Sequence, residues 1–138
     1  MQIKIRSYQP EDLPFIFSSW LETYKRTSAF AKRIKNDVYY EWHHRIIEQL
    51  LTKSKTLIAH PETEPNLICG YVTGEQNFIP VVHYVLVKEH YQKMGIGKIL
   101  IEALGVKPKE EFFFTHWTKP IDEIIKKHQE MIYDPYRI

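Results

Sequence analysis

A valine-rich stretch, a short loop with two glycines and an amphipathic helix follow one another between residues 79 and 104. The valine content of Ile79–Val87 is typical of a strand in the middle of a sheet. Gly95 and Gly97 lie where the helical spacing begins, and without side chains they leave nearby backbone amides open to a ligand. Free amides at a helix N-terminus attract phosphate. The segment therefore predicts an α/β domain with a phosphate-binding loop at a strand-to-helix turn.

Strand patterns occur on both sides of this segment. They are short stretches of alternating or continuous apolar residues, expected at Gln2–Ser7, Lys55–His60, Leu67–Glu75 and Glu111–His116. The stretch Met131–Ile138 is expected to add a last strand or to pack as an irregular end. The predicted fold class is an α/β (α+β) domain with a central mixed sheet and helices on both faces.

Helices are predicted where apolar residues recur every three or four positions. Two begin at Pro10 and at Asn36, and two more are expected at Ile96–Leu104 and Ile121–Gln129. The basic stretch Arg26–Lys35 is expected to be an irregular link. The inner face of the second helix is expected to carry Tyr39, Trp42, Ile46, Leu50 and either Ile47 or Leu51.

The bulk composition is that of one domain covering residues 1–138, without linkers or repeats. The net charge is +2 and the basic residues are dispersed, which argues against nucleic-acid binding. No apolar run approaches the roughly 20 residues that cross a bilayer, so no membrane association is expected. The single cysteine, Cys69, lies in an apolar strand pattern and is expected in the core. With no secretory signal, these features predict a cytoplasmic protein.

The loop sequence Gln92-Lys93-Met94-Gly95-Ile96-Gly97 resembles the Q/R-x-x-G-x-G/A signature of the GNAT N-acetyltransferases. The order of elements is similar to theirs from residue 2 to about residue 128. The whole chain resembles short GNAT-like proteins encoded by tailed bacteriophages, which would place it in the cytoplasm of a host cell. The resemblance implies the GNAT (acyl-CoA N-acyltransferase) fold, with acetyl-CoA as the co-substrate.

The resemblance also implies where acetyl-CoA binds. The strand before the loop separates from its neighbour at a bulge, and the main chain of Val85 and Val87 is expected to bond the pantetheine arm. Phe112–His116 forms the other side of the gap. The pyrophosphate is expected to meet the amides of the loop, with added charge or hydrogen bonds from its side chains, and two residues are expected beside the arm. The expected contacts are Gln92, Lys93, Met94, Gly95, Ile96, Gly97 and Lys98, with His116 and Trp117. The alternative is that the two glycines serve only the turn.

Acetyl transfer needs a base near neutral pKa to take a proton from the amine. His83 is the candidate, expected on the same face of its strand as Val85 and Val87 and also Val81. Certain GNAT enzymes that acetylate arylalkylamines have a histidine there. The alternatives are that His83 is a hydrogen-bonded strand residue, or that Glu75 is the base.

The general acid is left open. Many GNAT members use a tyrosine on the helix after the fifth strand, but the helix predicted from Ile121 has none. Tyr133, His116 and Tyr136 are the alternatives, or the thiolate leaves without a dedicated acid because its pKa is only about 8.5. No metal site is expected: His43 and His44 point about 100° apart on a helix and cannot chelate together.

These observations predict an enzyme that transfers acetyl directly from acetyl-CoA to a primary amine, on a small molecule or a protein. The alternative is a non-catalytic GNAT-like module that binds CoA weakly or acts through protein contacts. The basic residues within Lys25–Lys35 would favour an acidic partner, although a solvated loop is the preferred interpretation. An exposed strand at the C-terminal end would permit a homodimer.

Overall fold

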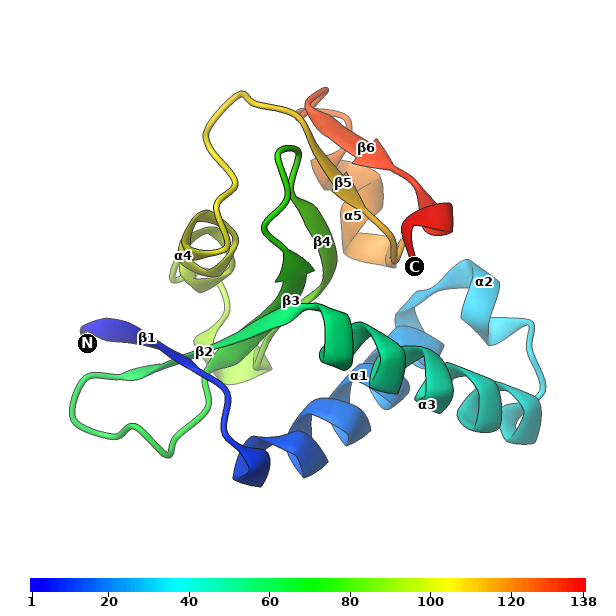
Figure 1. Ribbon diagram of the computed structural model, residues 1–138, viewed down its shortest axis with the longest axis horizontal. Helices are drawn as coiled ribbons and strands as arrows, with labels where there is room; N and C mark the ends of the chain where they lie inside the picture. Colours follow the sequence, from blue (N-terminus) through cyan, green and yellow to red (C-terminus); the bar gives the residue numbers. More distant parts are fainter.

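A single six-stranded sheet forms the centre of the molecule (Figure 1). The computed structural model describes residues 1–138, apart from the side chain of Glu123. The strands follow the order β1-β2-β3-β4-β5-β6. The pairs from β1 to β4 are antiparallel, whereas β4–β5 and β5–β6 are parallel, so the predicted mixed sheet is confirmed. The strands are β1 Ile3–Ser7, β2 Lys55–Pro61, β3 Gly70–Glu75, β4 Val81–Val87, β5 Phe112–Phe114 and β6 Met131–Tyr133.

Helices cover both faces of this sheet, as predicted (Figure 1). On one face lie α1 and α3, with the short α2 between them in sequence; on the other lies α4. The helices are α1 Leu13–Thr27, α2 Ala29–Lys32, α3 Asn36–Lys53, α4 Ile96–Ala103 and α5 Lys119–Ile124, with 3-10 turns η1 Pro10–Asp12, η2 Glu89–Tyr91 and η3 Pro135–Arg137. In the part of the chain that the structure describes, none of these helices has the length and hydropathy needed to cross a bilayer.

The core between the sheet and α1 is rich in aromatic rings. Trp20 is fully buried and stacks on Tyr84 of β4, with ring centroids 4.8 Å apart. Tyr24 and Tyr71 meet the Tyr84 ring edge-on or tilted. Ile16 and Trp20 lie four residues apart on α1 and are both buried, as the apolar stripe predicts.

The core on the other face is aliphatic and places α4 close to the sheet. Ile96, Leu100 and Leu104 pack on Val72 and on other strand residues. A β-carbon at Gly74 would lie 2.4 Å from Leu104 Cδ2, so glycine is required for this close approach. The close approach at Leu104 therefore holds the C-terminal end of α4 against the sheet, and the buried Ile96 side chain holds its N-terminal end.

The inner face of α3 differs from the prediction. Tyr39, Ile47 and Leu50 are buried as expected, but Trp42 is 55% exposed and His43 is buried instead. The burial stripe runs through positions 39, 43, 47 and 50–51, one residue round from the predicted one. The exposed Trp42 ring is covered by the Arg45 guanidinium at 4.6 Å.

Other element boundaries also shift. The stretch Arg26–Lys35 is not irregular: α1 continues to Thr27, and α2 follows with its first turn capped by the Ser28 hydroxyl. The last helix ends at Ile124 instead of Gln129. Four strands begin later or end earlier than predicted: β1 begins at Ile3, β3 at Gly70 and β4 at Val81, and β5 covers only Phe112–Phe114.

Candidate active site

β4 and its neighbour β5 separate part-way along β4. Their parallel pairing ends where Val82 meets Phe114, and the last bond runs from the Thr115 amide to the Val82 carbonyl at 3.2 Å. β4 continues to Val87, beyond the end of β5. The far half of β4 therefore has β3 on one side and a gap on the other.

The peptide groups of Val85 and Val87 face this gap. The Lys88 amide donates to the Cys69 carbonyl at 2.9 Å, so the even-numbered residues of this part of β4 direct their peptide groups towards β3. Val85 and Val87 direct theirs away from β3. The Gln92 side-chain amide donates to the Val87 carbonyl at 3.1 Å and covers that one acceptor.

A β-bulge interrupts β4 at His83. The pairing with β3 steps from Thr73 opposite Tyr84 to Gly74 opposite Val82, which leaves His83 as an extra residue. An extra residue allows two successive side chains to face the same way. His83 and Tyr84 both face the α1 and α3 side of the sheet.

The bulge corrects one expectation. His83 does not share a face with Val85 and Val87, which pack in the aliphatic core beside α4. The His83 ring instead contacts Glu75, which lies 3.6 Å from Lys53 at the end of α3. Simple alternation along β4 predicted the wrong side because the bulge changes the phase of the strand.

The turn into α4 leaves backbone amides free. Gly95 has φ 78°, a left-handed conformation that favours glycine, and its carbonyl accepts the first helical bond from the Ile99 amide at 3.1 Å. The amides of Ile96, Gly97 and Lys98 precede that bond, and no backbone carbonyl among the described residues accepts from them. The Ile96 side chain is buried and anchors the helix start.

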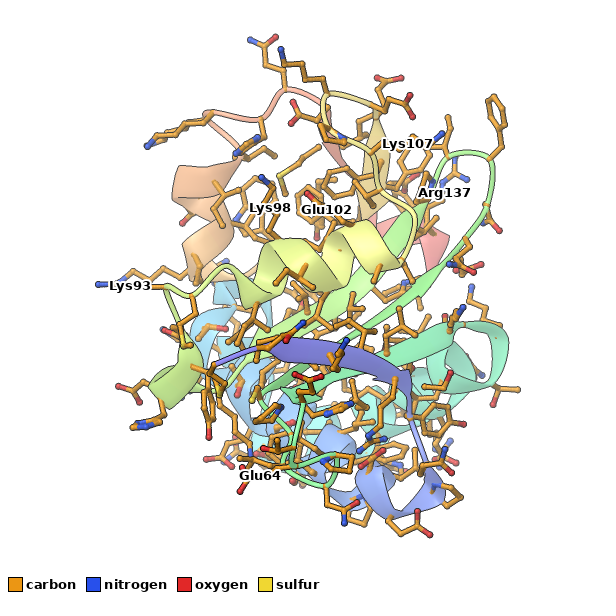
Figure 2. The ribbon with its side chains drawn as sticks, turned by 90° about the vertical axis from the view of Figure 1, so that its left-hand side faces the viewer. Glu64, Lys93, Lys98, Glu102, Lys107 and Arg137 are labelled. Carbon is orange, nitrogen blue, oxygen red and sulfur yellow. The ribbon has the colours of Figure 1, made fainter. Side chains whose placement is uncertain are left out.

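The space outside this turn is open. A β-carbon at Gly97 would have within 4 Å only Val87 Cγ2, at 3.8 Å. Figure 2 shows Lys93 projecting outward from the loop and Lys98 on the outer side of α4. The Lys98 side chain is 80% exposed, and Met94 is also exposed. The turn thus combines free amides, open space and two exposed cations, which suits a diphosphate.

Glu75 and His83 form a close pair beside the point where the strands separate. His83 Nε2 lies 2.5 Å from Glu75 Oε2, and the carboxylate is partly exposed whereas the imidazole is 1% exposed. Burial lowers the pKa of His83, although the hydrogen bond to Glu75 opposes that change. The imidazole is therefore neutral near pH 7, and Glu75 is the member of the pair that reaches solvent.

A chain of buried polar groups continues inward from His83. Its Nδ1 lies 3.0 Å from the Thr115 hydroxyl, which lies 2.9 Å from Nδ1 of His116. His116 Nε2 then lies 3.0 Å from Nε2 of His43 on α3. The chain joins β3, β4, the end of β5 and α3, and all its members except Glu75 are buried.

Aromatic rings enclose the inner end of this chain. The Tyr24 ring lies 4.7 Å from His116 and 5.1 Å from His43, and Trp20 and Tyr39 close the remaining sides. Burial lowers the pKa of His43 to about 4 and that of His116 well below its ordinary value. Both imidazoles are neutral at pH 7.

The two residues expected beside the pantetheine arm lie in different settings. His116 is buried and has both ring nitrogens engaged within the protein, which argues against the expected contact with acetyl-CoA. Trp117 is half-buried, and its indole donates to Asp122 Oδ1 at 2.5 Å. Thr115 and His43 are not among the site residues predicted from the sequence. For His43 a signal exists, because it follows Tyr39 by four residues and so lies on the same side of the helix.

The candidate acids are also separated. Tyr136 is 93% exposed. Tyr133 packs on Phe114 and Trp117 with ring centroids 5.3 Å and 5.1 Å away, and partial burial raises its pKa. Burial raises the pKa of Tyr24, and the nearness of Tyr133 adds to that change. Tyr133 therefore lies near the aromatic enclosure, whereas Tyr136 faces solvent.

Neither a protein-family model nor a curated protein sequence matches this chain. Solved structures do match it. A putative acetyltransferase from Pyrococcus furiosus superposes with a TM-score of 0.59 at 17% identity, over 96% of this chain and 82% of that one. An acetyltransferase of the GNAT family from Staphylococcus aureus superposes with a TM-score of 0.52 at 19% identity, over 75% of this chain. The chain has the GNAT fold.

The match covers only part of several of the neighbouring structures. The match spans 64% of the Staphylococcus aureus protein and 65% of Escherichia coli YjaB, for which the TM-score is 0.54 at 16% identity over 75% of this chain. The chain thus spans less than two thirds of the length of both. At these identities the likeness establishes the fold and leaves substrate and activity to the residues of the site.

Proposed function

We propose that this chain transfers an acetyl group from acetyl-CoA to a primary amine by direct attack of the amine on the thioester. The observation that carries the proposal is that free helix amides, an open strand edge and a carboxylate–imidazole pair occur together on a GNAT fold. Each of these features alone is also consistent with a purely structural role. Together they supply a diphosphate site, a site for an extended arm and a base.

The residues present fit acetyl-CoA. The amides of Ile96, Gly97 and Lys98 would receive the diphosphate, because they are unpaired and open to solvent. The outward peptide groups of Val85 and Val87 would pair with the amides of the pantetheine arm, once Gln92 releases the Val87 carbonyl. Acetyl-CoA supplies the activated acetyl group; the protein positions it.

The base in this proposal is the Glu75–His83 pair. The amine loses its proton to the Glu75 carboxylate, the amine nitrogen bonds the carbonyl carbon, and the carbon–sulfur bond breaks to release thiolate. His83 orients Glu75 through its Nε2–H, because the imidazole itself is too enclosed to touch the amine. The thiolate leaves as an anion and takes a proton from water, since a thiol pKa is about 8.5.

One observation favours the second candidate, a non-catalytic module. His83 is 1% exposed and both of its ring nitrogens have partners within the protein. Such a histidine is also consistent with a purely structural role. In that case the chain would bind CoA weakly or act through protein contacts.

Calorimetric titration with acetyl-CoA, followed by a thiol-release assay with a pool of primary amines, separates the two. The enzyme proposal expects saturable binding and CoA release that depends on the amine. Binding without amine-dependent release would support the module, and absence of binding would overturn the acetyl-CoA site itself. The pool of amines includes small molecules as well as peptide N-termini and lysines. The same proposal describes the protein as cytoplasmic, phage-encoded and homodimeric.

A further inference from the structure

The buried chain from Glu75 to His43 has a defined proton order. A carboxylate only accepts hydrogen bonds, so Nε2 of His83 carries a proton and donates it to Glu75. A neutral His83 then accepts at Nδ1, and the Thr115 hydroxyl is the donor there. The hydroxyl has one proton, so it must accept from His116.

The same logic fixes the inner end. His116 donates from Nδ1 to Thr115 and, being neutral, accepts at Nε2. His43 must then donate from Nε2. Every contact in the chain has one donor and one acceptor, and all the protons point towards Glu75. His83 and His43 carry their proton on Nε2, whereas His116 carries it on Nδ1.

Protonating His83 would conflict with this order. A second proton, on Nδ1 of His83, would need the Thr115 oxygen as an acceptor, and Thr115 would have to turn its own proton towards His116. His116 would have to move its proton to Nε2, and His43 would then have to move its proton to Nδ1. A charge on the outer imidazole is therefore coupled to a rearrangement of the two inner ones.

We propose that Thr115, His116 and His43 are positioning residues that hold His83 as a neutral donor to Glu75, and so keep the carboxylate oriented as the proton acceptor. The role in catalysis rests on the proposed function. The proton order itself does not, because it follows from contacts within the unliganded protein.

Several other titratable groups surround His83 and affect its protonation. Glu75 faces it from β3, Lys53 from the end of α3, and His116 from the segment after β5. Glu75 favours a charged imidazole, whereas Lys53 and burial oppose it. Tyr84, the next residue on β4, has a pKa raised by burial and stays neutral throughout the range in which histidine titrates.

Nitrogen-15 NMR of the histidine side chains tests the proton order in the unmodified protein, without acetyl-CoA. We expect His116 in the Nδ1–H form, and His83 and His43 in the Nε2–H form, at pH 7. Finding His116 protonated on Nε2, or His83 on both nitrogens, at pH 7 would overturn the proposal. This measurement needs no variant and no enzymatic activity.

The coupling is tested by His116→Phe, which keeps a ring inside the aromatic enclosure and removes both hydrogen bonds. Thr115 then turns freely and accepts from a protonated His83, so the His83 titration should move up by about one pH unit. Tyr24→Phe is the control, because Tyr24 packs on the same His116 ring without belonging to the chain. An unmoved His83 titration in His116→Phe, or an equal movement in Tyr24→Phe, would contradict the coupling.

A second pair of variants covers a failure of His116→Phe to fold. Thr115→Val removes the hydroxyl in nearly the same volume, whereas Thr115→Ser keeps it. We expect the His83 titration and the pH profile of amine acetylation to change in Thr115→Val and to be restored in Thr115→Ser. If the NMR results hold while no amine is acetylated, the proposed function fails and the proton order stands. If acetylation occurs and both Thr115 variants share the wild-type profile, the positioning role fails.

Discussion

Gly97 is the residue whose replacement tests the acetyl-CoA loop most directly. Glutamate at this position would place a carboxylate beside the amides of α4, where the diphosphate is proposed to bind. Repulsion between like charges should weaken acetyl-CoA binding by at least about 100-fold. Calorimetric titration measures the loss, and circular dichroism should show an unchanged fold, because a side chain there meets only Val87 Cγ2 at 3.8 Å.

The control for Gly97→Glu is Gln49→Glu, which adds the same charge on the exposed side of α3. Equal weakening by both variants would show that net charge, and not the loop, sets the affinity. Unchanged affinity in Gly97→Glu would remove the loop from the acetyl-CoA site.

Glu75 is the residue whose replacement tests the base. Glu75→Gln keeps an oxygen that accepts from His83 Nε2 but removes the carboxylate, so kcat should fall by about 100-fold or more while acetyl-CoA affinity is unchanged. Steady-state kinetics and titration measure the two quantities separately. Glu48→Gln is a matched control, since Glu48 also pairs with an imidazole, His44, at 2.8 Å but on the exposed face of α3. A Glu75→Gln protein with wild-type kcat would rule this carboxylate out.

At the scale of elements, the packing of α4 on the sheet depends on Gly74. In Gly74→Ala the new methyl group would lie 2.4 Å from Leu104 Cδ2 and 2.4 Å from the Val81 carbonyl oxygen. The backbone oxygen cannot move aside cheaply, so the free energy of unfolding should fall by about 2 kcal/mol. Urea unfolding measures the change.

Gly97→Ala is the matched control for Gly74→Ala. It adds the same methyl group at the start of α4, where space is open, and alanine favours a helix over glycine by up to about 1 kcal/mol. Its stability should be unchanged or slightly higher. Equal destabilisation in both variants would mean that the loss of stability in Gly74→Ala does not come from the close approach of Leu104 and Val81 to Gly74.

The elements that the sequence predicts well are those with local signals. The strand, glycine loop and α4 were predicted because valine content, two glycines and helical spacing all lie within about one supersecondary unit. The bulge at His83 has no such signal in its own strand, because Val81–Val87 contains neither glycine nor proline. The glycine at the step in register, Gly74, lies in the facing strand, so only the pairing with β3 reveals the bulge. The predicted face of His83 is wrong for this reason, and the predicted stripe on α3 is displaced because Trp42, although apolar, is exposed.

The chain of buried polar groups is a property of the whole molecule. His43 and His116 are 73 positions apart and meet only because α3 lies beside the segment that follows β5. Spacing along the sequence cannot express such a contact, so Thr115 and His43 were not predicted as part of the site. The chain has seven histidines and nineteen aromatic residues, counting Tyr, Phe and Trp together. This composition indicates only that some of them are buried next to one another.

Stability should depend on pH through these buried imidazoles. Their pKa values are lower in the folded protein, about 4 for His43 and well below the ordinary value for His116, so they stabilise the fold when neutral. The unfolded chain takes up protons near pH 6.5, and the folded one does not. The free energy of unfolding should therefore be highest above about pH 6.5 and fall by up to about 1.4 kcal/mol per pH unit per histidine towards pH 4.

Urea unfolding at intervals from pH 7.5 to pH 4 measures this slope. His116→Phe should flatten it, because one of the buried imidazoles is gone, whereas His44→Phe, which removes a half-exposed one, should not. Asp12, whose pKa is lowered by its hydrogen bond to Arg6, adds its own loss only as the pH falls through the carboxylate range. A wild-type free energy that is flat from pH 7 to pH 4.5 would contradict the burial of these histidines.

Between its pairings with Thr73 and Gly74 of β3, β4 contains one more residue than β3, and that residue is His83. The extra residue shifts the alternation of side chains along β4 by one position. Val82 and Val85 therefore face the same side of the sheet, although strict alternation would place them on opposite sides. Removing His83 would restore strict alternation, and both halves of the strand would keep their inward and outward side chains, but no imidazole would remain beside Glu75. The extra residue thus brings an imidazole to Glu75 without changing which side chains the rest of the strand buries.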